Sequence, residues 1–351
     1  MKYTDATLFT LAVCEYEING KNVVSARKDF SSLDFYKFSS KPDFEKFQVK
    51  CKEKFIDIDK FYMLKNDIKK ILDKDYDDHY KYESILEKEK YKSLMALSES
   101  ADGILSAFDF EFPHIYSTVK KDADKPFLLF YKGNISLLKN LQNNVAVIGL
   151  LNPEKNIVER EYIVVKKLVE CGMNIVSGLA KGCDTVAHKA CIESNGKTIA
   201  ILPSPLSHIY PAENRDLARK IVDTGGLLIS EYYKKPANKF ELTKRFIDRD
   251  RLQSMFSKAI LLSASYSKGN GDSGSRHAMA KAEEYSLFRA MLYNENSDEN
   301  NPQFGLNRDY HSKRKVNIMT QTVLNEMIKY TVKSNKPNLE QQSNQCQLSL
   351  Y

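Results

Sequence analysis

The chain has 351 residues, of which 42% are hydrophobic and 28% are charged. These proportions are those of a folded globular protein, and they exclude a mostly disordered, collagen-like or small disulfide-stapled chain. No apolar run approaches the roughly 18 residues that a membrane-spanning helix needs. The net charge is +7, from 53 Lys and Arg against 46 Asp and Glu. That balance is compatible with a nucleic-acid partner but does not require one.

The apolar segment 8–14 predicts a buried helix or strand close to the start of the chain. Its end, Leu11-Ala12-Val13-Cys14, has a faint likeness to a lipoprotein cleavage box. Acidic residues flank it, however, and Val13 is too large for such a site, so we expect a cytoplasmic protein. The six cysteines form no C-x-x-C pair, and no histidine lies at zinc-ligand spacing from them. We therefore expect reduced thiols, no metal site and no cofactor.

Residues 1–104 predict an N-terminal, mainly helical domain. Apolar residues recur at helical spacing in three stretches, from Asp43 to about Phe55, from Phe61 to Leu72 and over Ile85–Leu97. The zone is rich in Lys, Asp, Glu, Tyr and Phe, and no pattern in it indicates a particular chemistry.

Residues 105–315 alternate short apolar runs with amphipathic stretches. The predicted strands are Val145–Ile148, Asn174–Val176, Thr198–Leu202, Leu227–Ile229 and Ala259–Leu262. The predicted helices are about Asn156–Cys171, Thr185–Asn195, Glu213–Asp223 and Lys239–Ser257. Strands this apolar indicate a parallel sheet covered on both faces, which is a doubly wound α/β fold. Ligands of such sheets bind at the carboxyl ends of the strands.

The most informative stretch joins the second predicted strand to the next helix, and it reads Ser177-Gly178-Leu179-Ala180-Lys181-Gly182-Cys183-Asp184. Its small residues let the backbone approach a ligand, and a helix start favours an anion. Lys181 adds positive charge, and Asp184 is expected to cap the helix. Neither a P-loop nor a dinucleotide fingerprint is present, which favours a mononucleotide or a phosphate-bearing chain. A tight turn without any ligand stays open.

This stretch resembles the S-G-x-A-x-G-x-D signature of the DprA/Smf DNA-processing family. Other segments agree in order and spacing with motifs of that family, and the resemblance extends over about residues 105–310. These segments are Phe112-Pro113 with the stretch Lys125–Gly133, Tyr210-Pro211-Ala212-Glu213-Asn214, Gly226–Glu231, Phe246–Arg251 with Ser257, and Gly271-Asp272-Ser273-Gly274-Ser275.

The resemblance implies a Rossmann-like domain that binds single-stranded DNA without catalysis. It further implies a homodimer that protects the strand and loads a RecA-type recombinase, in natural transformation or recombination. The residues that we expect at the nucleic acid are Ser177, Gly178, Ala180, Lys181, Gly182, Asp184, Lys244, Arg249, Arg251, Ser273, Gly274, Ser275 and Arg276.

Some positions depart from the family pattern. The family usually has the sequence G-S-R after its first strand, and the Arg of this motif contacts DNA. This chain has Gly149-Leu150-Leu151 at that place. Arg276, in another loop, is expected to supply the missing positive charge. Arg249 and Arg251 are either a clamp on the phosphate backbone or a solvated basic helix end. Three tyrosines near strand ends either stack on bases or pack under the loops. They are Tyr210, Tyr232 and Tyr233.

An enzyme of the wider superfamily is the first alternative. The related phosphoribohydrolases carry P-G-G-x-G-T-x-x-E, and aligning Gly274-Ser275 with their G-T places Ala278 at the position of the catalytic Glu. Alanine cannot act as an acid or a base, and Glu283 and Glu284 lie further along the helix. We therefore expect no nucleotide hydrolysis.

The end of the chain offers the second alternative, an adaptor for a DNA polymerase sliding clamp. One amphipathic helix is predicted within residues 316–332, too little for the winged-helix domain that many family members carry there. A polar tail expected to be disordered follows over 333–351. It ends in Gln347-Leu348-Ser349-Leu350-Tyr351, which is similar to the clamp-binding motif Q-L-[SD]-L-F. Gln347, Leu348, Leu350 and Tyr351 are the expected contacts, although an incidental tail is also possible.

Overall fold

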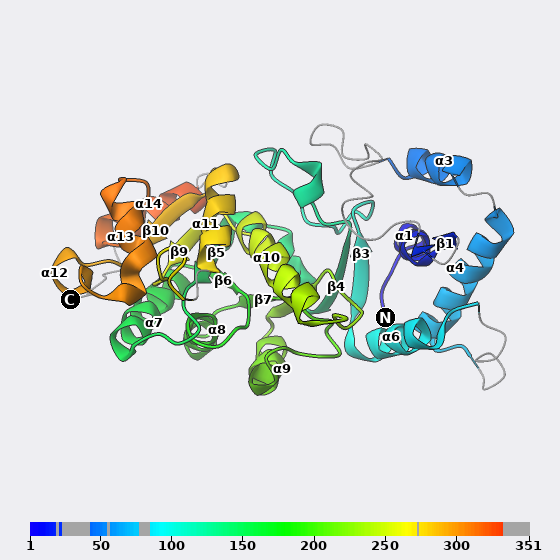
Figure 1. Cartoon of the computed structure of the whole chain (residues 1–351), viewed down its shortest axis with the longest axis horizontal. Helices are drawn as coiled ribbons and strands as arrows, with labels where there is room; N and C mark the ends of the chain where they lie inside the picture. The colour runs from blue at the N-terminus through cyan, green and yellow to red at the C-terminus, as the bar shows by residue number, and fades with distance from the viewer. Residues whose placement is uncertain (19–20, 23–42, 55–56, 77–84, 272–273, 333–351) are drawn as a thin grey trace. The chain divides into compact units, whose positions relative to one another are not determined.

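The computed structural model describes residues 1–332 except 19–20, 23–42, 55–56, 77–84 and 272–273. The predicted tail over 333–351 lies outside this part. The chain divides into two compact units (Figure 1). Unit 1 comprises residues 1–132, 204–208 and 229–237, and unit 2 comprises 133–203, 209–228 and the remainder from 238. The boundary expected at residue 104 therefore falls inside unit 1.

Unit 1 is helical apart from two small pairs of strands. Its helices are α1 (Asp5–Glu15), α3 (Phe44–Lys54), α4 (Ile58–Asp73) and α6 (Lys88–Ser100), with a short 3-10 turn at Asp122–Asp124. β1 (Glu17–Ile18) pairs with β2 (Lys21–Asn22), and β3 (Gly103–Ser106) pairs antiparallel with β4 (Leu128–Gly133). The apolar segment 8–14 is thus a helix, and all three predicted helical stretches are present.

Aromatic packing holds the helices of unit 1 together. The Phe9 ring of α1 meets the rings of Phe44, Phe47 and Phe61 edge-on, with centroids 5.6, 5.7 and 5.0 Å apart. Such edge-to-face pairs add to the burial of the rings themselves. Because α1 is buried on almost every side, its sequence is apolar rather than amphipathic.

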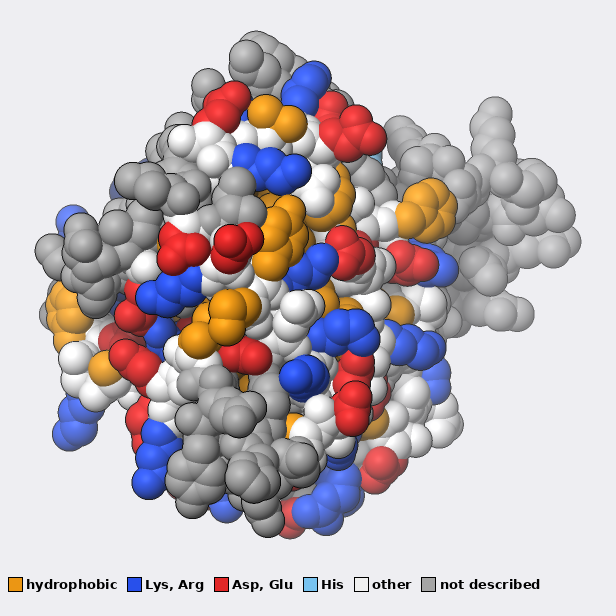
Figure 2. All heavy atoms as spheres, turned by 90° about the vertical axis from the view of Figure 1, so that its right-hand side faces the viewer, with side chains coloured by type: hydrophobic (Ala, Val, Ile, Leu, Met, Phe, Trp, Pro, Cys, Tyr) orange, Lys and Arg blue, Asp and Glu red, His pale blue; other side chains and the backbone are white. Residues whose placement is uncertain are grey.

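The outer surface of these helices mixes charges of both signs. Figure 2 shows Lys and Arg side chains interspersed with Asp and Glu side chains over the described part of this face. Lys69 and Asp73, one turn apart on α4, form an ion pair at 2.6 Å. Mixed charge of this kind keeps a surface solvated, whereas a nucleic-acid site needs a patch of positive charge.

Unit 2 contains the sheet that the sequence predicts. Its strands are β5 (Asn144–Ile148), β6 (Asn174–Ser177), β7 (Thr198–Leu202), β8 (Leu227–Ser230), β9 (Ala259–Leu262), β10 (Phe288–Met291) and β11 (Asn317–Ile318). Its helices are α7 (Lys155–Glu170), α8 (Cys183–Glu193), α9 (Arg215–Asp223), α10 (Lys239–Met255), α11 (Ser275–Glu284), α12 (Glu295–Asp298), α13 (Gly305–Ser312) and α14 (Gln321–Val332). Short 3-10 turns lie at Ile135–Leu138, Leu141–Asn143, Ala212–Asn214 and Pro302–Phe304.

The strand order in unit 2 is β11-β10-β9-β5-β6-β7-β8. From β11 to β7, each strand pairs parallel with the next strand in this order. From β5 the chain first winds outward through β6, β7 and β8, and it then returns to β9 on the other side of β5. Right-handed crossovers consequently place α7, α8 and α9 on one face and α10 and α11 on the other (Figure 1). The doubly wound α/β fold is confirmed, and its switch point lies between β5 and β9.

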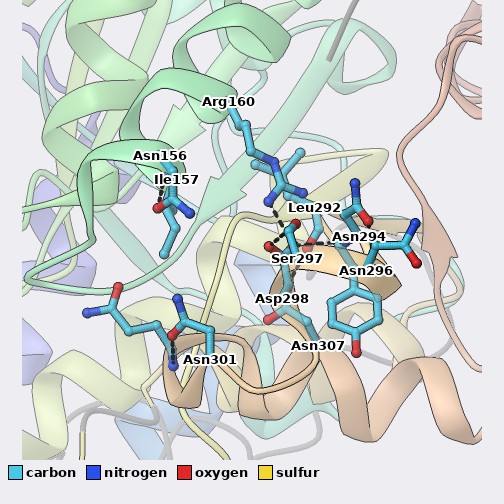
Figure 3. Close-up of polar contacts among 12 residues, drawn as sticks. Asn156, Ile157, Arg160, Leu292, Asn294, Asn296, Ser297, Asp298, Asn301 and Asn307 are labelled. Atoms are coloured by element: carbon cyan, nitrogen blue, oxygen red, sulfur yellow. Dashed lines mark hydrogen bonds and ion pairs between the residues drawn. The ribbon is translucent and has the colours of Figure 1, made fainter. Parts of the chain in front are cut away.

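A buried ion pair ties α7 to α12. Arg160 donates to Asp298 at 2.7 Å, and Asp298 also accepts the Asn294 amide at 2.8 Å (Figure 3). Both charged side chains are nearly inaccessible to solvent. The Arg160 guanidinium also lies 5.2 Å from the centroid of the Phe304 ring. The pair therefore fixes the segment after β10 against the helix that follows β5.

In the part of the chain that the structure describes, no helix is both long enough and apolar enough to cross a membrane. Four described cysteines, Cys14, Cys51, Cys183 and Cys191, are free thiols.

We predict that Asp298→Ala lowers the free energy of unfolding by about 3–5 kcal/mol, because it leaves the Arg160 charge buried without its carboxylate. Urea denaturation followed by circular dichroism measures this loss. Asp216→Ala is the control, because Asp216 belongs to an exposed pair with Arg219 on α9 and should cost no more than about 1 kcal/mol. Equal losses in the two variants would contradict the structural role of the buried pair.

Candidate nucleic-acid interface

A cavity of about 320 Å³ lies at the switch point of the unit 2 sheet. Its walls come from the loops after β5, β6 and β7, from the first turn of α11 and from the middle of α10. These loops all leave the carboxyl ends of parallel strands, which is where the fold was predicted to bind its ligand. The volume is within the range of about 300–1,000 Å³ that is typical of small-molecule sites.

The glycine-containing loop between β6 and α8 forms one wall. Gly182 has φ +71°, and a Cβ atom there would lie 2.2 Å from the Leu150 carbonyl oxygen. Only glycine permits this approach, which the Cys183 amide secures by donating to the same oxygen at 2.9 Å. Leu150 and Leu151, the departure from the family pattern, thus belong to a tight contact between two loops, and Leu151 also lines the cavity.

The buried side chain of Asp184 holds the loop by hydrogen bonding to its backbone. It lies in the first turn of α8, whose N-cap residue is Gly182, so the expectation that Asp184 caps the helix is wrong. Its carboxylate instead accepts the Ala180 amide at 3.1 Å. Burial raises the pKa of Asp184, while the nearby Arg249 charge and the Gly178 and Ala180 amides oppose this shift. Two of the small-residue amides expected to face a phosphate are therefore directed at a carboxylate of the protein itself.

Arg249 joins this loop to α10. It donates to the Gly178 carbonyl oxygen and forms ion pairs with Asp184 at 3.6 Å and Asp250 at 3.3 Å. Gly178 is essential to this contact, because a Cβ atom there would lie 1.5 Å from the Arg249 Nη1 atom. Arg249 is 7% exposed and lines the cavity. It is therefore a buried structural cation rather than a solvated helix end.

Asn214, from the motif around Tyr210-Pro211, supports the loop from the other side. Its Nδ2 donates to the carbonyl oxygens of Leu179 and Ala180 at 2.8 and 3.2 Å, and to the Thr185 hydroxyl at 2.9 Å. Leu179 has φ +60°, a conformation that is unfavourable for a residue with a side chain. These bonds and the burial of Leu179 hold the loop in that conformation.

The mouth of the cavity carries an exposed ion pair and an aromatic side chain. Lys181 pairs with Glu213 at 2.5 Å, and this hydrogen bond raises the pKa of Lys181. Tyr210 is 40% exposed, and its ring lies 5.7 Å from that of Phe246 on α10. Tyr210 can thus present a face to a base. Tyr233 cannot, because it is buried in unit 1 and donates to Glu15, and Tyr232 also belongs to unit 1.

The remaining predicted residues are distributed as follows. Gly274 and Ser275 line the cavity at the start of α11, followed by the partly exposed Arg276. Lys244 is exposed on α10. Ser273 lies outside the described residues. The Ser177 hydroxyl donates to the Val147 carbonyl oxygen at 2.7 Å, and the Ser275 hydroxyl to that of Gly149 at 3.1 Å, so both hydroxyls serve the fold.

Arg251 stands apart from the cavity. It is 2% exposed, and its guanidinium donates to the Asp248 carbonyl oxygen at 2.5 Å. This burial argues against Arg251 as a contact to a phosphate chain. Lys181, Lys244 and Arg276 are the predicted cations whose side chains reach solvent.

The contribution of α10 to the cavity was not predicted from the sequence. Phe246, Asp250 and Gln253 line it together with Arg249. The spacing of these residues, three or four apart, places them on one face of the helix and is the signal that could have identified them. Gln253 is 1% exposed, and its Oε1 has no hydrogen-bond partner among the described residues.

Ala278 lines the cavity. The sequence resemblance aligns this position with the catalytic Glu of the related phosphoribohydrolases. Glu283 and Glu284, at the far end of α11, are not among the lining residues and pair with Arg289 and Lys281 at 3.4 and 2.9 Å. Among the described residues, no group of His, Cys, Asp or Glu is arranged to hold a metal ion.

Glu161 of α7 is buried beneath the start of α8. Burial raises the pKa of Glu161 to about 8, the Asp184 charge adds to this shift, and the Cys183 thiol and Ser263 hydroxyl oppose it. A carboxyl group with this pKa is mostly protonated at neutral pH. The loop at the cavity is therefore supported by a neutral acid rather than by a second negative charge.

We predict that Glu161 makes the protein less stable as the pH rises. The unfolded carboxyl loses its proton near pH 4.5 but the folded one only near pH 8, so stability falls between these values by on the order of 1 kcal/mol per pH unit. Glu161→Gln should remove this contribution. Urea denaturation of both proteins at pH 5 and 8 measures it, and an equal pH dependence in the two would contradict the assignment.

Comparison with known proteins gives concordant results. A family model described as DNA recombination-mediator protein A matches residues 103–323. Protein Smf of Borreliella burgdorferi is 36% identical over 146 residues, which cover 41% of this chain and 44% of that protein. The DNA processing protein DprA of Streptococcus pneumoniae is 43% identical over 109 residues, or 31% of this chain and 37% of that one. These matches thus span less than half of either relative.

Two solved structures have a similar fold. DprA from Streptococcus pneumoniae superimposes with a TM-score of 0.54 at 24% identity, covering 78% of this chain and 93% of that one. DNA processing protein A from Helicobacter pylori, described for its single-stranded DNA binding mode, superimposes with a TM-score of 0.53 at 24% identity. It covers 64% of this chain and 94% of the Helicobacter chain.

Proposed function

Because the chain belongs to the DNA recombination-mediator protein A family, we propose that it binds single-stranded DNA at the cavity of unit 2. The observation that carries this proposal is the position of the cavity at the switch point of the sheet, between two helix starts and beside solvent-reaching cations. Positive charge near helix N-termini binds phosphates without reading the base sequence. The aromatic mouth at Tyr210 adds a stacking surface, which favours single strands over duplex DNA.

The phosphate contacts belong to the rim of the cavity rather than to its interior. The Gly178 and Ala180 amides face Asp184, whereas the amides of Lys181 and Gly182 donate no hydrogen bond within the described part of the chain. These two amides, with the Lys181 side chain and Arg276, are the groups that we assign to the DNA backbone. A strand at this rim would place its bases next to Tyr210.

We predict that Lys181→Ala and Arg276→Ala each weaken binding to oligo-dT and reduce its salt slope by about one unit, since each removes one contact to a phosphate. Fluorescence anisotropy at several salt concentrations measures both effects. Lys189→Ala is the matched control, because Lys189 is exposed in the middle of α8, away from the cavity. The proposal fails if the control changes the slope as much as Lys181→Ala does.

The finer function that the family resemblance implies is also a proposal. We propose that the bound strand is protected and passed to a RecA-type recombinase by a homodimer, during natural transformation or another recombination process. What supports this is the family membership alone, because no short motif marks the recombinase or dimer contacts. Analytical ultracentrifugation tests the dimer, and strand-exchange assays with added recombinase test the loading.

A second proposal concerns the tail. Gln347-Leu348-Ser349-Leu350-Tyr351 combines two leucines and an aromatic residue with a Gln, the chemistry of a segment that docks in a hydrophobic groove. We therefore propose that it binds a DNA polymerase sliding clamp. The segment lies outside the described residues, and the support is the sequence match.

Deleting residues 347–351 should abolish capture of the protein by immobilised clamp and leave its affinity for oligo-dT unchanged. Leu348→Ala combined with Leu350→Ala should have the same effect, because it removes the apolar contacts. Ser349→Ala is the control and should be captured like the wild type. Undiminished capture of the deletion variant would refute the clamp proposal.

A further inference from the structure

The first two turns of α10 carry an exposed stripe of side chains outside the cavity. Phe240 is 81% exposed and Ile247 is 43% exposed, and Thr243 and Lys244 between them also face solvent. Because these four residues are three or four positions apart, they lie on one face of the helix. We call them the α10 stripe. None of the four belongs to the lining of the cavity.

The same side of α10 is buried in the second half of the helix. Arg251, one turn after Ile247, is 2% exposed. The Ser254 hydroxyl donates to the Ala278 carbonyl oxygen of α11 at 2.8 Å, and α11 lies against α10 here (Figure 1). The neighbouring helix therefore covers the end of this face and leaves the α10 stripe open to solvent.

The start of α10 is held in place, so the exposure is not that of a frayed helix end. The Asn238 side chain caps the helix by accepting the Glu241 amide at 2.9 Å. Glu241 in turn pairs with Arg245, one turn further along, at 2.6 Å. An aromatic ring is thus presented to solvent on an ordered helical turn.

Positive charge surrounds the exposed ring. Lys239 and Lys244 are both exposed, and neither ammonium group has an ion-pair partner in the part of the chain that the structure describes. Phe240 therefore lies between two unpaired cations. An aromatic ring beside lysines is the combination that holds single-stranded nucleic acids, since the ring stacks on a base and the cations contact phosphates.

The α10 stripe is continuous with the mouth of the cavity. Phe246, whose ring lies 5.7 Å from that of Tyr210, directly precedes Ile247. From Phe246 back to Phe240 the helix axis covers about 9 Å, at 1.5 Å per residue. Stacked nucleotides repeat at about 3.4 Å, so this path has room for about two or three of them.

We propose that the α10 stripe is a second contact for single-stranded DNA, in which Phe240 stacks on a base and Lys239 and Lys244 contact phosphates. The inference rests on the proposed binding of a strand at the rim, and it lengthens the bound segment beyond the cavity. Exposed apolar faces also bind proteins. Lysine is depleted in protein interfaces, however, so the charge on this face favours DNA.

Phe240→Trp tests the stacking directly, because the chain contains no tryptophan. The indole fluorescence of this variant should be quenched by oligo-dT at concentrations at which anisotropy shows the strand to be bound. Ile163→Trp is the matched control, since Ile163 is 37% exposed on α7, on the other face of the sheet. Its fluorescence should not change. A bound strand that leaves the Phe240→Trp fluorescence unchanged, or quenches both variants equally, would overturn the inference.

Affinity measurements separate stacking from other apolar contacts. Phe240→Ala and Phe240→Leu should each weaken binding to a twenty-nucleotide oligo-dT by about fivefold or more, because leucine is apolar but has no aromatic face. Lys244→Ala should lower the salt slope by about one unit. Full affinity in Phe240→Leu would overturn the stacking role. Since Phe240 is exposed, its variants should unfold at the same urea concentration as the wild type.

The outcomes distinguish this inference from the function on which it rests. Failure of the wild type to bind any strand rejects the proposed function itself. If Lys181→Ala weakens binding and Phe240→Ala does not, the rim contact stands and the α10 stripe is not a DNA contact. If Phe240→Ala keeps its affinity for oligo-dT but loses self-association in analytical ultracentrifugation, the stripe is a contact between copies of the chain, which also overturns the inference.

Discussion

The geometry of the candidate site depends on one buried ion pair, between Asp184 and Arg249. Asp184 holds the loop after β6 through the Ala180 amide, and Arg249 holds the same loop from α10 through the Gly178 carbonyl oxygen. Both side chains are less than 10% exposed, so the pair is protected from solvent screening. Without it, the two elements that form opposite walls of the cavity would lose the contact that sets their spacing.

This pair changes how the glycine-containing loop functions. A glycine loop before a helix commonly directs its amides at a bound phosphate. Here the Asp184 carboxylate accepts hydrogen bonds from two amides of the loop in place of a phosphate. The loop therefore takes its conformation around a carboxylate of the protein itself. The consequence is a division of the site into a rim where Lys181 and Arg276 reach solvent and an interior lined by the mutually paired Asp184, Arg249 and Asp250. Such a division suits a ligand with charged and neutral parts, as a nucleic-acid strand has.

The sequence predicted the fold well because strand burial and helix periodicity are local signals. The predicted strands 198–202 and 259–262 have the same bounds as β7 and β9 of the structure, and each of the other three predicted strands is one residue shorter than the observed strand. It located the cavity through the loop after β6, but it could not show that Arg251 is buried while Lys181 reaches solvent. Nor could it show that the Gln253 Oε1 atom lacks a hydrogen-bond partner among the described residues, because that is a property of the packing around α10. Positions of this kind depend on tertiary contacts that no short motif encodes.

The most direct test of the account is photocrosslinking of the protein to a single strand that contains 5-iodouracil, followed by mass spectrometry of the crosslinked peptides. Aromatic residues that stack on the base react preferentially, so we expect crosslinks at Tyr210 or Phe246 at the mouth of the cavity. An excess of unlabelled strand should suppress them. Crosslinks confined to the helices of unit 1, with none on the peptides that line the cavity, would contradict the claim that DNA binds at the switch point.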